Sequence, residues 1–241
     1  MPFTLSHPAL IIPIYKIRKK WFSISGLITG SIAPDFEYFF KMRKDISNYS
    51  HTLLSILYFN LPLALIVIYV FHAIVRKQLI KNLPSFLLCR VSDYYNIEWK
   101  LIFLKKAPIL ILSVILGCLT HIGWDFFTKY IANLLYTNQD TIFSFSSWIH
   151  YSYIYSTIHF TFSFIGLGFL TMSVMKLPVR KHVVPDRANH NFWLVVYVMT
   201  FLFFIPRVIF GADLQTLDFL VSFISAFLMS LILSSLYFSY K

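Results

Sequence analysis

Charged residues are scarce in this chain: they make up 13% of its 241 residues, whereas hydrophobic residues make up 58%. In a water-soluble domain of this size, about a quarter of all residues are charged. This chain has about half that share, so much of its surface must face something other than water. The composition therefore excludes an ordinary soluble domain and indicates an integral membrane protein.

Cysteine, glycine and acidic residues are also few, and each shortage excludes a class of protein. The two cysteines, Cys89 and Cys118, form neither a metal motif nor a disulfide framework. Seven glycines and ten prolines exclude a low-complexity or collagen-like chain. Ten acidic residues against 21 lysines and arginines give a net charge of +11. In a membrane protein this excess indicates contact with anionic lipid headgroups and argues against nucleic acid as a partner.

In place of charged residues, the chain has apolar runs long enough to cross a bilayer, which takes about 20 residues. Two further segments are shorter or more polar. Leu5–Ile14 is too short to cross, and we expect a half-helix there that packs inside the bundle or lies at the interface. Arg76–Lys106 alternates apolar and basic residues, as an amphipathic helix on the membrane surface does. The five long runs are Thr52–Val75, Ala107–Thr128, Ser156–Met175, Phe192–Phe210 and Leu217–Phe238.

These runs predict an all-α, polytopic helical membrane protein with five to six transmembrane helices. The sixth candidate is Trp21–Phe40, which has the right length but contains a proline and two acidic residues. We find no polar linker, so we expect a single helical membrane domain over residues 1–241. Within it, the motifs described below occupy residues 1–170, and residues 192–238 form a C-terminal helix pair.

The distribution of basic residues predicts the orientation in the cytoplasmic membrane. If Trp21–Phe40 is counted as a crossing, 16 of the 21 basic residues fall on one side. By the positive-inside rule that side is cytoplasmic. The residues on it lie in Lys16–Lys20, Arg76–Lys106 and Lys176–Arg187, with Lys241.

The strongest local signal is His121-Ile122-Gly123-Trp124-Asp125, inside an apolar run. Residues four apart on a helix share one face, with Cβ atoms about 5–6 Å apart, so one divalent ion can bridge His121 and Asp125. Imidazole nitrogen with a carboxylate oxygen suits zinc or another transition ion. The alternative is a hydrogen-bonded pair that ties helices together without metal. Ionisable residues within a membrane are functional hypotheses in either case.

Other ionisable residues are expected at the same membrane level as this pair. By the charge count, the ends of the helices that carry them fall on the non-cytoplasmic face. Acids and histidines that are distant in sequence therefore converge there, and we expect the site on that face. The residues are Asp35, Glu37, His51 and His159, together with His121 and Asp125.

Several candidate residues also have a simpler interpretation. Asp35 follows Pro34 and is either a metal ligand or a turn acid, whereas Glu37 is either a second ligand or a catalytic base. His51 equally suits an interfacial helix start. His7, taken singly, is more typical of a core histidine than of a ligand.

In motif order, the chain resembles a family of bacterial membrane proteins of unknown function, number 4184 among such domain families. The resemblance covers most of Met1–Leu170, and the segment around His159 is similar to a later histidine segment of that family. The motifs that carry it are Met1-Pro2-Phe3-Thr4-Leu5-Ser6-His7-Pro8-Ala9, Gly30-Ser31-Ile32-Ala33-Pro34-Asp35-Phe36-Glu37-Tyr38-Phe39, Ser50-His51-Thr52-Leu53 and the His121–Asp125 motif.

That family is in turn similar in motif order to membrane-bound metal-dependent hydrolases, which look like distant relatives of zinc-dependent phospholipase C and P1 nuclease. The chain differs from those hydrolases at Ser47-Asn48-Tyr49, where they usually place a His-Arg pair. The resemblance implies a divalent metal, zinc being favoured, with Glu37 as the candidate base. The implied ligands are His7, Asp35, His51, His121 and Asp125, to which we add His159.

Three functions remain open at this point. A metal-dependent hydrolase with an outward-facing site would act on a phosphoester, such as a lipid or a cell-wall precursor. A non-catalytic scaffold or binding protein would use the same cluster to lock helices together. A transporter would use it as a proton or cation relay.

Overall fold

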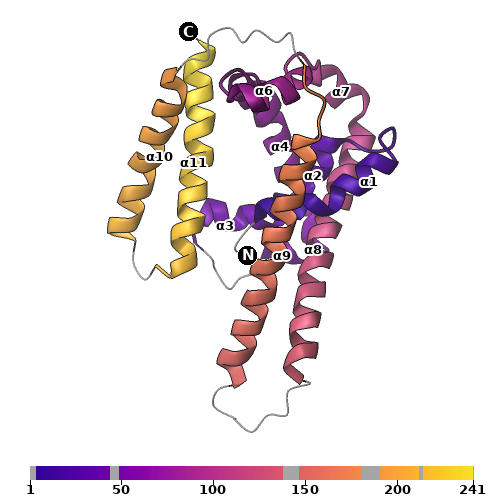
Figure 1. Ribbon diagram of the computed structural model, residues 1–241, viewed down its shortest axis with the longest axis vertical. Helices are drawn as coiled ribbons and strands as arrows, with labels where there is room; N and C mark the ends of the chain where they lie inside the picture. Colours follow the sequence, from indigo (N-terminus) through magenta and orange to yellow (C-terminus); the bar gives the residue numbers. More distant parts are fainter. Residues whose placement is uncertain (1–3, 44–48, 138–146, 181–189, 212–213, 241) are drawn as a thin grey trace. The chain divides into compact units, whose positions relative to one another are not determined.

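A computed structural model describes residues 4–43, 49–137, 147–180, 190–211 and 214–240, and within these ranges the chain is helical with no strand (Figure 1). Met1–Phe3, which open the first family motif, lie outside the described residues. Five helices of the described part are long and apolar enough to cross a membrane. The predicted all-α, polytopic fold is therefore confirmed. These helices span Ile56–Lys81, Ala107–Tyr136, Tyr153–Met175, Asn191–Phe210 and Thr216–Ser239.

The first of these spans is one continuous helix with two wider stretches. It runs through η4 (Ile56–Asn60), α4 (Leu61–Val70), η5 (Phe71–Val75) and α5 (Arg76–Lys81), and η4 and η5 have π-helical hydrogen bonding. Pro62 follows the first π stretch. It has no N–H, and its ring crowds the carbonyl four residues earlier. A wider turn before it relieves that crowding.

Trp21–Phe40, the sixth candidate span, is divided into short pieces. Ser23 caps α2 (Ile24–Ile32) by accepting a hydrogen bond from Gly26 N. The 3₁₀ turn η2 (Ala33–Asp35) and the six-residue α3 (Phe36–Lys41) follow. Nine helical residues extend only about 14 Å, so α2 cannot cross a bilayer. Because the charge count treated this segment as a crossing, the assignment of sides stays a prediction.

The described residues form two compact units that share several long helices. The first unit comprises residues 1–35, 49–62 and 108–171, and the second comprises residues 36–48, 63–107 and 172–241. Every predicted metal ligand falls in the first unit, whereas Glu37 falls in the second. Each unit is described by itself below.

In the first unit, α2 crosses α8 (Ala107–Thr137) at backbone contact distance. A Cβ atom added at Gly30 would lie 2.2 Å from Val114 O, and one added at Gly117 would lie 2.5 Å from Leu27 O. Ser113 strengthens the crossing, because its hydroxyl accepts a hydrogen bond from Ser23 N at 2.8 Å. The missing side chains let the main chains meet, and this sets the position of the residues that follow Gly30.

The N-terminal turn η1 (Thr4–Leu10) lies against α9 (Ser147–Met175) in a similar way. A Cβ atom added at Gly166 would approach Ser6 Cβ to 3.0 Å and Ser6 O to 3.1 Å. η1 continues into α1 (Ile11–Ile17), so the predicted half-helix is a 3₁₀ turn followed by a short α-helix. The contact at Gly166 holds the turn that carries His7 against the apolar body of α9.

In the second unit, α10 (His190–Phe210) and α11 (Thr216–Ser239) pack side by side as an antiparallel pair (Figure 1). Their buried core combines Val75 with Phe192, Val196 and Leu231. Buried serines of α11 allow close packing, and several return their hydroxyls to its own carbonyls, as Ser225 does to Val221 O. The predicted C-terminal helix pair is therefore present.

The segment between the first two spans folds into short helices, α6 (Ser85–Val91) and α7 (Trp99–Lys105), where the sequence predicts one amphipathic helix. Aromatic contacts attach α7 to the first span. The Trp99 ring lies edge-on to Tyr69 with centroids 5.2 Å apart, and it stacks on His72 at 6.1 Å.

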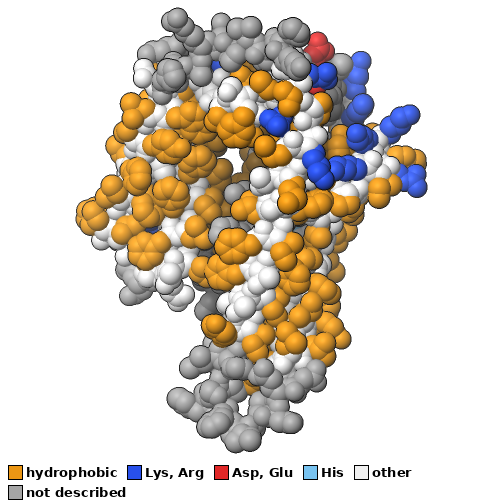
Figure 2. All heavy atoms as spheres, in the orientation of Figure 1, with side chains coloured by type: hydrophobic (Ala, Val, Ile, Leu, Met, Phe, Trp, Pro, Cys, Tyr) orange, Lys and Arg blue, Asp and Glu red, His pale blue; other side chains and the backbone are white. Residues whose placement is uncertain are grey.

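Apolar side chains dominate the outer surface that Figure 2 shows. Within the spans, between 11% and 44% of the most apolar window is buried inside the protein. The exposed remainder is hydrocarbon, which is stable only against lipid. This surface identifies a membrane protein.

Candidate metal centre

The first unit brings together five of the predicted site residues from four separate segments. His7 is in η1, Asp35 ends η2, His51 ends the 3₁₀ turn η3 (Tyr49–His51), and His121 and Asp125 lie on α8. All are buried except His51, which is partly exposed. Convergence of these sequence-distant polar groups is the geometry that the motifs predict.

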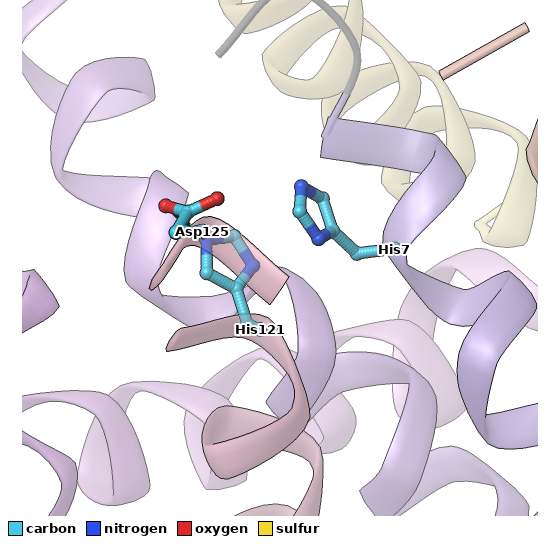
Figure 3. A group of neighbouring side chains, drawn as sticks. All are labelled: His7, His121 and Asp125. Atoms are coloured by element: carbon cyan, nitrogen blue, oxygen red, sulfur yellow. Dashed lines mark ion pairs between the residues drawn. The ribbon is translucent and has the colours of Figure 1, made fainter. Parts of the chain in front are cut away.

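One group of possible ligands consists of His7, His121 and Asp125, shown in Figure 3. Each offers a ligand atom, and these atoms lie within 4.8 Å of one another. His121 Nε2 is 3.8 Å from Asp125 Oδ2, as expected for residues one helical turn apart. The His7 ring stacks on the His121 ring with centroids 4.1 Å apart.

A second group consists of Asp35, His51 and His121 and satisfies the same 4.8 Å limit. Asp35 Oδ1 lies 3.2 Å from His51 Nε2 and 3.5 Å from His121 Nε2. His51 Nε2 is also 3.8 Å from Asp125 Oδ2. The two groups share His121, so they form one continuous cluster of imidazoles and carboxylates.

Hydrogen bonds behind the cluster fix how two of the imidazoles face it. His121 Nδ1 lies 2.6 Å from Ser31 O, and a carbonyl oxygen only accepts, so Nδ1 carries the proton. His51 Nδ1 lies 3.0 Å from Ser50 Oγ, whose own proton goes to Pro34 O at 2.6 Å. Both rings therefore direct Nε2 toward the carboxylates. Metal-ligating histidines are held in this way.

The turn that carries His51 is supported by a buried polar network. Asn60 Nδ2 donates to Ser50 O at 2.8 Å, and the single hydroxyl proton of Ser55 is shared between Ser50 O at 2.8 Å and Thr52 O at 2.6 Å. Ser50, Ser55 and Asn60 are each fully buried. Because buried hydrogen bonds of this kind are costly to break, they hold His51 in one position.

The charges of the site suit a cation. Burial, together with the neighbouring His121, lowers the pKa of His7 well below its ordinary value. Burial alone would raise the pKa of Asp35, but His121 and the hydrogen bond from His51 outweigh it, and that pKa lies well below its ordinary value. At neutral pH His7 is therefore neutral and Asp35 ionised. These are the forms in which both residues bind metal.

Three buried atoms of the cluster have no hydrogen-bond partner among the described residues: His7 Nδ1, His121 Nε2 and Asp125 Oδ1. A buried polar atom without a partner is costly. Nitrogen and carboxylate oxygen are ligands that zinc and related ions prefer. The residues therefore fit a divalent cation, and His7, Asp35, His51, His121 and Asp125 are the ones able to hold it.

The remaining two predicted residues lie outside both groups. His159 is buried on α9, interacts electrostatically with His7 and packs against Tyr155 with ring centroids 5.2 Å apart. Glu37 belongs to the second unit, where its carboxylate accepts a hydrogen bond from Lys41 Nζ at 2.8 Å. His159 as a ligand and Glu37 as a base stay predictions.

Sequence reasoning missed the groups that orient the imidazoles. Ser50 stands directly before His51, and a hydroxyl next to a ligand is a signal that could have been used. Ser31 acts through its main-chain oxygen, for which the side chain gives no signal. The neighbouring Gly30 is the sequence feature that points to this contact, because it permits the close helix crossing.

Comparison with known proteins supports the family resemblance and adds no activity. Neither the comparison with curated proteins nor that with solved structures gives a match. The family model described as "Domain of unknown function (DUF4184)" matches residues 1–236. The match covers nearly the whole chain, and the chain belongs to this family.

Proposed function

We propose that the chain is a membrane-embedded hydrolase that binds a divalent cation, zinc in the first instance, and acts on phosphoesters. The observation that carries the proposal is the orientation of His121. Its Nδ1 proton is committed to Ser31 O, so Nε2 faces Asp35 Oδ1 at 3.5 Å and Asp125 Oδ2 at 3.8 Å.

Groups that only accept hydrogen bonds repel one another when they face across a dry site. A cation between them removes that repulsion. An additional proton on His121 would also remove it and is the alternative to a metal. That alternative corresponds to a scaffold, in which the cluster only ties segments together. Metal content distinguishes the two.

A bound zinc ion lowers the pKa of its water toward about 7 and stabilises charge on a phosphoryl oxygen. The chain's own residues would orient the reactants. Glu37 is the candidate base that would accept a proton from an attacking water. A lipid-linked phosphoester is the favoured substrate class because the cluster includes His121 and Asp125 of the candidate membrane span α8.

The first experiment measures metal in the purified protein. We expect wild-type protein equilibrated with zinc and then desalted to retain it, as quantified by mass spectrometry of the metal. His121→Ala/Asp125→Ala should lose it. The control, His72→Ala/Asp93→Ala, removes the same residue types from the second unit and should keep it. Equal, negligible zinc in wild type and both variants would remove the proposal.

The second experiment measures catalysis directly. Zinc-loaded protein in phospholipid nanodiscs should cleave a chromogenic phosphodiester or release a phosphorylated headgroup, and His121→Ala/Asp125→Ala should not. If the protein binds zinc through the cluster yet cleaves neither substrate, a binding role replaces the hydrolase.

We also propose that the cluster faces away from the cytoplasm. Lys129 is exposed on α8 beyond Asp125, and Lys105 is exposed just before α8 begins. In a chain with Cys89 and Cys118 replaced by serine, a cysteine at position 129 should react with a membrane-impermeant maleimide added to intact cells. A cysteine at position 105 should react only after lysis. The reverse pattern would place the cluster on the cytoplasmic side.

A further inference from the structure

A cavity of about 520 Å³ in the second unit lies where the first span meets the segment that follows it. It is separate from the metal cluster, none of whose residues lines it. The cavity combines three cations, one carboxylate and apolar surface. Its lining residues are Arg76, Lys77, Asn96, Ile97, Glu98, Trp99, Lys100 and Leu104.

Arg76 is the unusual member, because its side chain is almost completely buried, with 2% exposure. Its Nη2 donates to Ile97 O at 2.9 Å. Nε and Nη1 are also buried, and neither has a hydrogen-bond partner among the described residues. A guanidinium carries a permanent charge, and leaving its donors unsatisfied is expensive. An anion in the cavity would satisfy them.

The other charged residues of the cavity favour an anion. Lys77 and Lys100 are exposed at its edge, and the Lys77 ammonium lies over the Tyr95 ring at 6.0 Å. Glu98 also lines the cavity, yet it forms no ion pair with any cation of the described residues. The balance is three positive charges against one negative charge.

The shape of the cavity is maintained by aromatic packing. Trp99 is held against Tyr69 and His72 of the first span, and it contacts Phe103 of α7 with ring centroids 6.2 Å apart. The bond from Arg76 to Ile97 O joins the first span to the segment that carries Trp99. The charged residues and the indole are therefore held together by contacts between these two segments.

We propose that this cavity binds a phosphate group. A guanidinium whose Nε and Nη1 donors have no partner among the described residues, together with the neighbouring ammonium groups, matches the oxygen atoms of a phosphate. The cavity lies near the end of a membrane span, so the group comes either from an anionic lipid headgroup or from a soluble phosphate. The inference is independent of the proposed hydrolase, because no residue is shared.

The test uses full-length protein in nanodiscs of phosphatidylcholine with a minor fraction of phosphatidic acid, and native mass spectrometry counts the retained lipids. Wild type should retain phosphatidic acid in preference to phosphatidylcholine. Arg76→Gln should weaken retention about tenfold or more, and Lys100→Gln should weaken it several-fold, since each removes a charge-assisted hydrogen bond. Lys105→Gln makes the same change on α7 outside the cavity and should have no effect.

Lys100→Gln also separates ligand binding from a purely structural role of Arg76, because Lys100 is exposed and its loss should leave the fold intact. If Arg76→Gln fails to fold, the test is the comparison of phosphatidic acid retention between Lys100→Gln and Lys105→Gln. If inorganic phosphate displaces the retained phosphatidic acid, the proposal holds with a soluble phosphate as ligand. If phosphate leaves the retention unchanged, the proposal holds with a lipid headgroup as ligand. Equal losses in all variants, or no preference in wild type, would overturn it.

Discussion

His121 and Ser31 are separated by 90 residues, and the Nδ1 atom of one lies 2.6 Å from the carbonyl oxygen of the other. This bond depends on the crossing of α2 and α8, because Ser31 directly follows Gly30 at the point of closest approach. A metal ligand on one helix is thus oriented by the main chain of another. The geometry of the cluster and the packing of the helices are therefore coupled.

Zinc should stabilise the folded protein. A ligand that binds only the native state adds about 2.7 kcal/mol at roughly a hundredfold excess over its dissociation constant. We expect the Tm of wild type, measured by intrinsic fluorescence in detergent, to rise with zinc and fall after chelation. His121→Ala/Asp125→Ala should show neither change. A similar rise in that variant would assign the stabilisation to other sites.

Gly30→Ala should loosen the helix crossing and the cluster together. The new methyl group would lie 2.2 Å from Val114 O, and relieving such an overlap costs about 1–3 kcal/mol or more. We expect a lower Tm and weaker zinc retention. Gly168→Ala is the control, because a Cβ there has nothing within 4 Å and alanine favours helix. Wild-type zinc affinity in Gly30→Ala would contradict the coupling.

Ser50→Ala should weaken the metal site without removing a ligand. It deletes the hydroxyl that connects His51 Nδ1 to Pro34 O. Loss of such a supporting group commonly costs 10- to 100-fold, roughly, in metal affinity. Competition with a fluorescent zinc chelator measures the change. Thr171→Ala is the control, because it removes an exposed hydroxyl that donates to Leu167 O within α9. The zinc affinity of this variant should equal that of wild type.

Phe192→Ala should destabilise the second unit and spare the metal cluster. Phe192 is fully buried between the C-terminal helix pair and the first span, so its truncation leaves a cavity that costs about 3 kcal/mol. Phe210→Ala, at 84% exposure, should cost little. Unfolding in a denaturing detergent compares the two. Loss of zinc from folded Phe192→Ala would show that the cluster depends on the second unit.

The extent to which this fold follows from sequence differs between its parts. Runs such as Phe192–Phe210 are recognisable because lipid selects for uninterrupted apolar length. Trp21–Phe40 has that length too, but η2 divides it at Pro34, so length alone overestimated it. Helix breaks of this kind depend on packing partners that a single segment does not reveal.

For the candidate site, residue spacing predicted one pair. His121 and Asp125 are one turn apart, so their proximity is a property of any helix. Nothing local brings His7, Asp35 and His51 to them: the predicted order of helix ends suggested it for Asp35 and His51, and the family pattern added His7. The buried Arg76 was not recognised, because a basic residue at the end of a span looks like an ordinary membrane anchor.

Three of the seven glycines, Gly26, Gly30 and Gly117, lie at the crossing of α2 and α8. There the main chains of the two helices are in direct contact, because no bulky side chain lies between them. The distance between them therefore does not vary with the size of neighbouring apolar residues. The lipid-facing exterior can be exchanged, residue by residue, with little effect on the spacing that positions the imidazole. Substitutions on that exterior would be tolerated in this chain as long as these three positions remain glycine.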